Sequence, residues 1–378
     1  MPPRRVIVTV LGLLAMLHFY IGMRLIPASG VHLPGAVAAI LLLILSTLLL
    51  PAGLIASRLK RWKRADQLAW AGLLAMGFFS SLLVLTVLRD VALGLLSVFS
   101  TASPELVRNS AIGVPLLAFG VTLVGLINAR RVARVVEVEV PIKDLPAALH
   151  GYSIVQISDV HVGPTIKRGY LNAIVTKVNA LEPDAIAITG DLVDGSVRRL
   201  KLHTEPLARL NARDGAFFVT GNHEYYSGAE EWIAEMRRLG VRVLMNEHVL
   251  CEREGESLMI AGVTDFTAHQ FNESHRSDPK RAAAGAPDTV RARILLAHQP
   301  RSATAAAAAG FDLQLSGHTH GGQFFPWNLF VPLQQPFTAG LNRLAQLWVY
   351  TSRGTGYWGP PKRFGAPSEI TRVRLVAA

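Results

Sequence analysis

Apolar and polar positions divide the chain into two contrasting parts. In the first part, four long stretches lack Asp, Glu, Lys and Arg, near 6–23, 35–56, 67–88 and 109–129. Each is long enough for a membrane-spanning helix, which needs about 20 residues. Four such stretches in succession predict a transmembrane helical region over residues 1–134. The intervening segment 91–108 is short and broken by polar residues, and we expect a separate helix at the membrane surface there.

From residue 135 onward the apolar runs become shorter. The sequence "ARVVEVEVPI" alternates as a half-buried strand does. Five further apolar runs each end in polar residues: "YSIVQIS", "DAIAIT", "GAFFVT", "ARILLA" and "FDLQLS". Helical stretches such as 167–180 and 229–239 lie between them. Strands that alternate with helices predict an α/β domain over residues 135–378.

Composition supports a chain that lies partly in lipid. Hydrophobic residues make up 50% and charged residues 17%, whereas soluble proteins carry about 25% charged residues. The net charge of +11 is uneven, since residues 1–134 hold 13 Lys/Arg against 3 Asp/Glu and the remainder holds 25 against 24. The basic excess therefore accompanies the apolar spans, which argues against a nucleic-acid partner. The single cysteine, Cys251, excludes an intrachain disulfide and a thiolate-based metal site.

The basic residues also predict an orientation. Ten precede the first span, separate spans two and three, or follow span four: Arg4, Arg5, Arg58, Lys60, Arg61, Lys63, Arg64, Arg130, Arg131 and Arg134. Only Arg24, Arg89 and Arg108 lie in the other connections. Positive charge favours the cytoplasmic side of a bacterial-type inner or plasma membrane, so four spans place the C-terminal domain in the cytoplasm. The alternative interpretation of the first span is a secretory or twin-arginine signal. One membrane-spanning helix fewer or more would place the domain on the extracytoplasmic side.

Each of the five apolar runs after residue 150 ends in residues that bind metal ions. These are Asp159 and His161, then Asp191, then Asn222, then His298, and finally His318 and His320, with His223 as a further histidine directly after Asn222. In α/β sheets ligands bind beyond the carboxyl ends of the strands, so these side chains are expected at one site. Carboxylate and imidazole ligands suit divalent Mn, Fe, Zn or Mg. Seven candidate ligands are too many for one tetrahedral ion and predict two ions, about 3.5–4 Å apart.

The motifs "SDVH", "GD", "GNHE", "AHQP" and "GHTH" resemble the five motifs of the calcineurin-like metallophosphoesterases. The resemblance covers about 145–376. "LHGYSIVQISDVHVG" and "SRGTGYWGPPKRFGAPSEITRVRL" look like the opening and closing segments of the YkuE-like membrane-associated phosphohydrolase branch. The resemblance implies an αββα-sandwich metallophosphoesterase domain after the transmembrane bundle.

The resemblance also implies a role for each matching residue. Asp159, His161 and His320 would hold one metal, and Asn222, His298 and His318 the other. Asp191 would bridge the two ions, and His223 would protonate or stabilise the leaving group. Two positions depart from the pattern of many relatives: Gly195 replaces an arginine after Asp194, and Glu224 replaces an aspartate.

The implied function is a membrane-anchored, dinuclear metal-dependent phosphohydrolase that uses metal-hydroxide attack on a phosphoester or pyrophosphate. A lipid-linked or amphiphilic substrate is the favoured interpretation. Three alternatives remain: an enzyme for soluble substrates with the spans as anchor only, a non-catalytic metal-binding membrane scaffold, and a transporter with an appended domain. The complete ligand set together with His223 argues against the scaffold, because a scaffold does not need a histidine at the leaving group. The scarcity of polar residues in the spans argues against the transporter.

The aromatic segment "GGQFFPWNLF" follows the last two histidines. Phe324, Phe325, Trp327 and Phe330 either complete the core or stay exposed at the rim of the site. Prolines at 326, 332 and 336 break regular structure in this segment. We therefore hypothesise that 321–341 is a hydrophobic lip for an amphiphilic phosphoester, with Trp327 and Phe330 as its main contacts.

Overall fold

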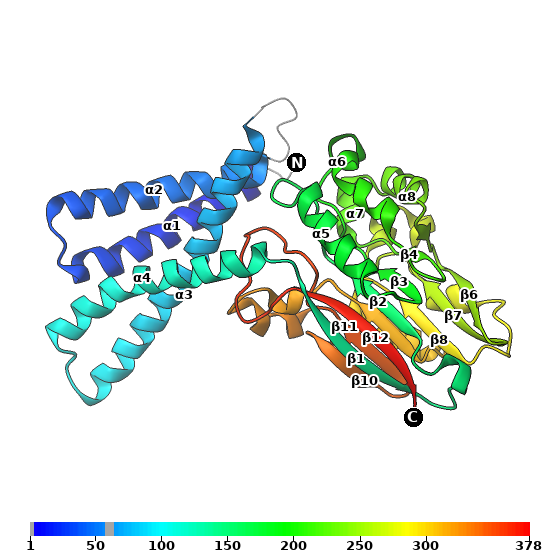
Figure 1. Ribbon diagram of the computed structural model, residues 1–378. Coiled ribbons are helices and arrows are strands. Elements are labelled where there is room, and N and C mark those ends of the chain that lie inside the picture. Colours follow the sequence, from blue (N-terminus) through cyan, green and yellow to red (C-terminus); the bar gives the residue numbers. More distant parts are fainter. Residues whose placement is uncertain (1–3, 57–63) are drawn as a thin grey trace. The chain divides into compact units, whose positions relative to one another are not determined.

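The computed structural model describes residues 4–56 and 64–378 and divides into two compact units. The helical unit comprises Met1–Ile127 and Gly359–Lys362, and the sheet unit comprises Asn128–Trp358 and Arg363–Ala378. Four apolar helices precede a mixed α/β region, as the sequence predicts (Figure 1). The four basic residues Arg58, Lys60, Arg61 and Lys63, used in the orientation argument, lie outside the described residues.

Among the described residues of the helical unit, four helices are long and apolar enough to cross a membrane. They are α1 (Arg4–Ser29), α2 (Leu33–Ala56), α3 (Ala65–Phe99) and α4 (Pro104–Arg130). The expectation of a separate helix over 91–108 is wrong, because α3 continues through Phe99 and α4 begins at Pro104. The Ser103 side chain accepts a hydrogen bond from the backbone N–H of Leu106, and proline suits the first turn of a helix, so α4 begins earlier than the apolar pattern suggests.

Helices α2 and α3 approach each other closely at a pair of glycines. A Cβ atom placed on Gly72 would lie 2.5 Å from the Cα of Gly53 and 2.5 Å from the carbonyl oxygen of Leu49. Small residues at such crossings let helix backbones pack directly, which is a common device in lipid. Ile21, Leu82 and Ala118 belong to a buried apolar cluster within the same unit.

The chain returns to the helical unit near its C-terminal end. Lys362 is buried there, and its ammonium group donates hydrogen bonds to the carbonyl oxygen of Gly77, at 2.9 Å, and to the hydroxyl of Ser81. Both partners lie on α3. Hydrogen bonds to α3 thus attach the segment Gly359–Lys362 to the helical unit.

Two six-stranded sheets form the sheet unit. The first has the order β1-β12-β2-β3-β4-β5 and the second the order β10-β11-β9-β8-β7-β6. The strands are β1 (Arg134–Ile142), β2 (Ser153–Ile157), β3 (Ala185–Ile188), β4 (Ala216–Phe218), β5 (Arg242–Val243), β6 (Glu247–Arg253), β7 (Glu256–Gly262), β8 (Ala292–Leu296), β9 (Leu313–Ser316), β10 (Gly340–Leu344), β11 (Leu347–Thr351) and β12 (Glu369–Ala377). Strands β2 to β5 are parallel, as are β7, β8, β9 and β11.

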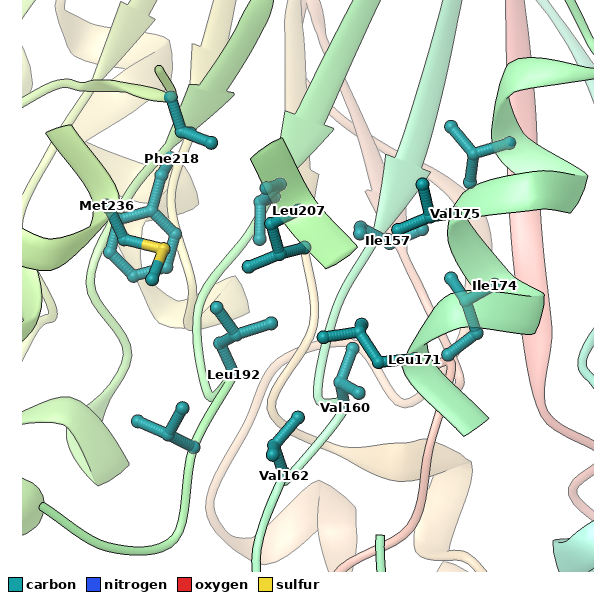
Figure 2. Close-up of a cluster of buried hydrophobic side chains, with 14 of the residues drawn as sticks. Ile157, Val160, Val162, Leu171, Ile174, Val175, Leu192, Leu207, Phe218 and Met236 are labelled. Atoms are coloured by element: carbon teal, nitrogen blue, oxygen red, sulfur yellow. The ribbon is translucent and has the colours of Figure 1, made fainter. Parts of the chain in front are cut away.

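Three apolar clusters hold the sheet unit in four layers. The first sheet packs one face on α5 (Arg168–Asn179), α6 (Val197–Thr204) and α8 (Ala229–Arg238). Figure 2 shows this cluster, with Leu171, Ile174 and Val175 of α5 beside Ile157 of β2. Ile154 and Ile294 belong to the cluster between the two sheets. A third cluster covers the outer face of the second sheet with α9 (Pro279–Ala283) and α10 (Ala303–Ala308). The αββα fold class predicted from the sequence is confirmed.

Candidate metal centre

The loops after five strands bring the predicted site residues together under backbone strain. These loops follow β2, β3, β4, β8 and β9. Five non-glycine site residues adopt positive φ angles: Asp159 (53°), His161 (55°), Asp191 (50°), His318 (71°) and His320 (52°). This left-handed conformation is unfavourable for side chains that carry a Cβ, and it persists where the surrounding structure enforces it. Such residues cluster at functional sites, which draws attention to this edge of the sheets.

One group of candidate ligands consists of Asp159, His161 and His320. The Nε2 atoms of the two histidines lie 3.1 Å apart, and His320 Nε2 lies 3.5 Å from Asp159 Oδ1. His161 Nδ1 donates a hydrogen bond to Asp194 at 3.1 Å, which leaves the lone pair of Nε2 directed toward His320. A carboxylate behind a histidine in this way fixes the tautomer that binds a metal.

A second group consists of Asp191, His298 and His318. His298 Nε2 lies 3.2 Å from Asp191 Oδ2 and 3.2 Å from His318 Nδ1. His298 Nδ1 donates to the carbonyl oxygen of Thr189 at 2.8 Å, so its Nε2 is again the free ligand atom. Asp191 Oδ2 also lies 4.0 Å from His161 Nε2, which places this carboxylate between the two groups.

Asn222 provides an independent test of whether this cluster suits metal ions. It begins α7 (Asn222–Ser227), and its Oδ1 is buried without a hydrogen-bond partner among residues 4–56 and 64–378. An unsatisfied buried amide oxygen is unusual because burial without a partner costs free energy. A cation beside this oxygen supplies the missing partner. The donor set of carboxylates, imidazoles and one amide therefore fits divalent cations.

Electrostatics keep two of the histidines neutral, as metal ligands must be. Burial and the neighbouring His298 lower the pKa of His318 to about 3. Burial and the guanidinium of Arg363 lower the pKa of His320 well below its ordinary value. Burial opposes ionisation of Asp191, but the imidazoles around it outweigh burial and hold its pKa well below the usual range.

His223 has a different environment from the ligand groups. Its Nδ1 donates to Asp194 Oδ1 at 2.6 Å, and its Nε2 lies 4.0 Å from Asp191 Oδ2. Burial acts to lower its pKa, but the carboxylates of Asp191 and Asp194 prevail and raise it to about 9. A protonated imidazole oriented by a carboxylate has the features of a proton donor.

Three residues that the sequence interpretation gave no role support the site. Asp194 accepts hydrogen bonds from both His161 and His223. It therefore has a role at the site although Gly195 replaces the arginine that follows this aspartate in many relatives. Glu224 accepts backbone N–H bonds from Gly221, Asp191 and Leu192 at 2.7–2.9 Å and so fixes the loop that carries Asp191. The motif "GNHE" could have indicated a role for Glu224, because this residue lies two positions after the candidate ligand Asn222. No sequence motif indicated the third supporting residue.

That third residue is Arg363, which is fully buried behind His320. Its guanidinium lies 3.1 Å from His320 Nδ1 and donates to the carbonyl oxygens of His320, Arg353 and Gly356 at 2.5–2.9 Å. The charge therefore fixes the loop 353–366 around a candidate ligand. Arg363 lies within the segment "SRGTGYWGPPKRFGAPSEITRVRL", but the sequence of that segment does not indicate that this arginine is buried.

The glycines before the ligands are required by space as well as by turn geometry. A Cβ on Gly221 would lie 2.2 Å from Asp191 Oδ1, and one on Gly317 would lie 2.1 Å from Asp159 Oδ2. Neither glycine has a positive φ angle. Their role is thus to let the backbone approach the carboxylates closely.

The aromatic segment after the ligands is divided between core and surface. Phe324 is buried, as the core interpretation expects, whereas Phe325, Trp327 and Phe330 are about half exposed. Trp327 and Phe330 lie together, with ring centroids 5.9 Å apart. Short 3₁₀ turns at Trp327–Leu329 and Val331–Leu333 replace regular structure around the prolines. Neither aromatic belongs to the ligand groups.

Comparisons with known proteins agree with the geometry. Residues 152–322 match the family model described as Calcineurin-like phosphoesterase. A "Transmembrane protein with metallophosphoesterase domain" from Danio rerio is 39% identical over 76% of this chain and 68% of its own length. Its namesake from Bos taurus is 42% identical over 70% of this chain and 63% of its own length.

A bacterial relative, the "Uncharacterized metallophosphoesterase YkuE" of Bacillus subtilis, is 30% identical over 61% of this chain and 81% of its own length. The chain spans about two thirds of the length of the two vertebrate relatives. It is a membrane protein with a phosphoester-hydrolase domain, and it belongs to the calcineurin-like metallophosphoesterase family.

Proposed function

We propose that this protein is a membrane-anchored phosphohydrolase that uses two divalent cations to hydrolyse an amphiphilic or lipid-linked phosphoester or pyrophosphate. Residues 1–134 would anchor it, and residues 135–378 would carry the reaction. The family assignment supports phosphoester hydrolysis, and the two His/Asp groups support metal binding. Two cations held there would lower the pKa of a bound water and neutralise charge on the phosphoryl oxygens.

The geometry supports a division of labour among the site residues. Asp159, His161 and His320 would hold one cation, and Asn222, His298 and His318 the other. Asp191 would contact both, because it lies within 4.0 Å of a histidine from each set.

His223 would be the catalytic acid. Its Nε2 would place a proton on the departing oxygen, since Asp194 occupies its Nδ1. Asp194 would act as a positioning residue, because it accepts hydrogen bonds from Nδ1 of both His161 and His223 and leaves their Nε2 atoms for the cation and the substrate.

One observation carries the choice of an amphiphilic substrate. Most exposed large apolar side chains of the sheet unit lie on loops after β4, β7, β9 and β11, at the edge that bears the candidate ligands. They are Tyr226, Phe266, Phe271, Phe325, Trp327, Leu329, Phe330, Leu333, Trp358 and Phe364. Large exposed apolar patches mark sites for apolar ligands, partners or membranes. Within this patch we propose 321–341 as a lip, with Trp327 and Phe330 in contact with a hydrocarbon chain.

The lip is tested by comparing an amphiphilic substrate with a small one. Trp327→Ala and Phe330→Ala should raise KM for a long-chain alkyl phosphate by about 5- to 30-fold, since each removes roughly 1–2 kcal/mol of apolar contact. Hydrolysis of a small soluble phosphoester should stay within twofold of the unsubstituted protein. A parallel loss of both activities with loss of folding would mean that these side chains serve the core instead.

The rival proposals predict other outcomes. An enzyme for soluble substrates would show no preference for the long-chain ester in the unsubstituted protein. A non-catalytic metal scaffold would bind two equivalents of metal and hydrolyse neither substrate. Either result would remove the corresponding part of the proposal.

A further inference from the structure

His223 is bordered by two aromatic side chains that are themselves open to solvent. Its ring centroid lies 5.2 Å from that of Tyr226 and 5.6 Å from that of Trp358, with interplanar angles of 66° and 75°. Tyr226 is 63% exposed and Trp358 is 53% exposed. The rings therefore contact His223 with one part and leave most of their surface free beside it.

The apolar surface continues outward from Tyr226. The ring of Phe271 lies 5.6 Å from that of Tyr226 in an edge-to-face arrangement, and Phe271 is 51% exposed. Phe271 also packs on Tyr225, whose hydroxyl hydrogen-bonds with His275 at 3.0 Å. A strip of aromatic side chains thus extends from His223 through Tyr226 to Phe271.

The backbones of the two residues beside His223, Trp358 and Tyr226, are both held in place. Gln323 binds the backbone of Trp358 twice, accepting from its N–H and donating to its carbonyl oxygen, each at 2.9 Å. Tyr226 lies within α7, which begins at the candidate ligand Asn222. Half-exposed aromatic side chains on a fixed backbone bind apolar groups at low entropic cost.

We infer that the apolar part of the substrate is its leaving group, and that Tyr226 and Trp358 hold the first carbons of that group beside His223. The inference rests on the proposed function. His223 faces the departing oxygen, so whatever is bonded to that oxygen lies against the two rings. Besides ring faces, the strip offers only the Tyr226 hydroxyl and the Trp358 indole N–H as polar groups. Two such groups are fewer than the polar edges of a nucleoside need, which favours an aliphatic chain.

The chemistry that follows is balanced. The oxygen of a water molecule bonds to phosphorus, and the bond from phosphorus to the chain-bearing oxygen breaks. The electron pair stays on that oxygen, which takes a proton from His223 Nε2, while the proton lost by the water returns to solvent. The products are a long-chain alcohol and a phosphate, or the phosphate ester of a head group.

A diester with two unequal arms reveals which bond breaks. Decyl methyl phosphate yields decanol and methyl phosphate if the chain departs, or methanol and decyl phosphate if the methyl group departs. The two alcohols have nearly the same basicity, so the product ratio reports how the diester is positioned. The full-length protein in detergent with Mn²⁺ should release decanol in at least about tenfold excess.

Tyr226→Ala and Trp358→Ala should each lower this ratio about 3- to 10-fold, as expected for losing one aromatic contact. Trp358→Phe should largely restore it. Leu250→Ala, an exposed apolar side chain on β6, is the matched control and should leave the ratio unchanged. Because the ratio is measured within one reaction, partial unfolding of a variant does not alter it.

Two results would overturn the inference. The first would leave the whole proposed function standing, and the second would leave metal-dependent phosphoester hydrolysis without the amphiphilic substrate. One is an excess of decyl phosphate from the unsubstituted protein. The other is faster hydrolysis of a nucleoside monophosphate than of decyl phosphate, with Trp358→Ala losing mainly the nucleotide activity. Failure of the metal-loaded protein to cleave any phosphoester would instead remove the proposed function together with the inference.

Discussion

Asp191 shows how a single side chain can connect two groups of ligands. Its Oδ1 accepts the backbone N–H of His223 at 2.8 Å, and its Oδ2 lies 3.2 Å from His298 Nε2 and 4.0 Å from His161 Nε2. The other carboxylate, Asp159, accepts the backbone N–H of His318 at 3.0 Å and serves one group. Losing the shared carboxylate should therefore affect both cations.

We predict that Asp191→Asn lowers bound metal from two equivalents to below one, whereas His161→Ala retains at least one. The amide keeps the shape of the carboxylate but removes the negative charge that a bridging ligand supplies to both ions. Metal content per protein, measured by mass spectrometry of the purified variants, distinguishes them. Two ions still bound in Asp191→Asn would contradict a bridging role.

The sequence predicts the seven candidate ligands because each follows an apolar run and lies within one of the five short motifs. It does not predict Arg363 behind His320, because nothing local distinguishes a buried arginine from an exposed one. That burial depends on carbonyl oxygens at 320, 353, 356 and 366, which only the folded loop brings together. Supporting residues of this kind need tertiary structure.

Among whole elements, the centres of the four helices are predictable from hydropathy and their ends are not. The apolar stretches lie inside α1 to α4, but α3 and α4 divide the segment 91–108 between them. Residues 91–99 continue the helix because they contain no proline and four of the nine are alanine or leucine, and a serine with a following proline begins the next one. Hydropathy measures preference for lipid, whereas helix ends depend on capping.

The crossing of α2 and α3 gives a prediction with opposite signs at two glycines of one helix. Gly72→Ala should destabilise the protein, because its new methyl group would meet backbone atoms of Leu49 and Gly53 at 2.5 Å. Gly94→Ala meets nothing within 4 Å and should be neutral or stabilising by up to ~1 kcal/mol, since alanine favours helices. Thermal unfolding of both variants in the same detergent measures the difference. Equal midpoints would show that the helices do not cross at this pair.

For the molecule as a whole, the two units differ in net charge and in where their apolar side chains are exposed. The basic excess lies in residues 1–134, while the remainder is nearly neutral. Most exposed large apolar side chains of the sheet unit lie on segments that follow β4, β7, β9 and β11, at the edge that bears the candidate ligands. A phosphohydrolase for amphiphilic substrates needs both features, because anchoring confines it to the membrane and an apolar rim accepts a chain that leaves the lipid.

The basic residues lead to a prediction about which side of the membrane holds the site. With four spans, a reporter fused after Ala378 should read cytoplasmic, and one inserted in the connection at 30–32 should read extracytoplasmic, because ten of the thirteen basic residues of 1–134 lie on the side of the chain ends. Paired fluorescent and alkaline phosphatase fusions measure each position. A cytoplasmic site would receive substrates from the inner leaflet. An extracytoplasmic reading after Ala378 would mean either a reversed orientation or an odd number of spans, which the reporter at 30–32 distinguishes. The substrate would then come from the outer leaflet or the space beyond it.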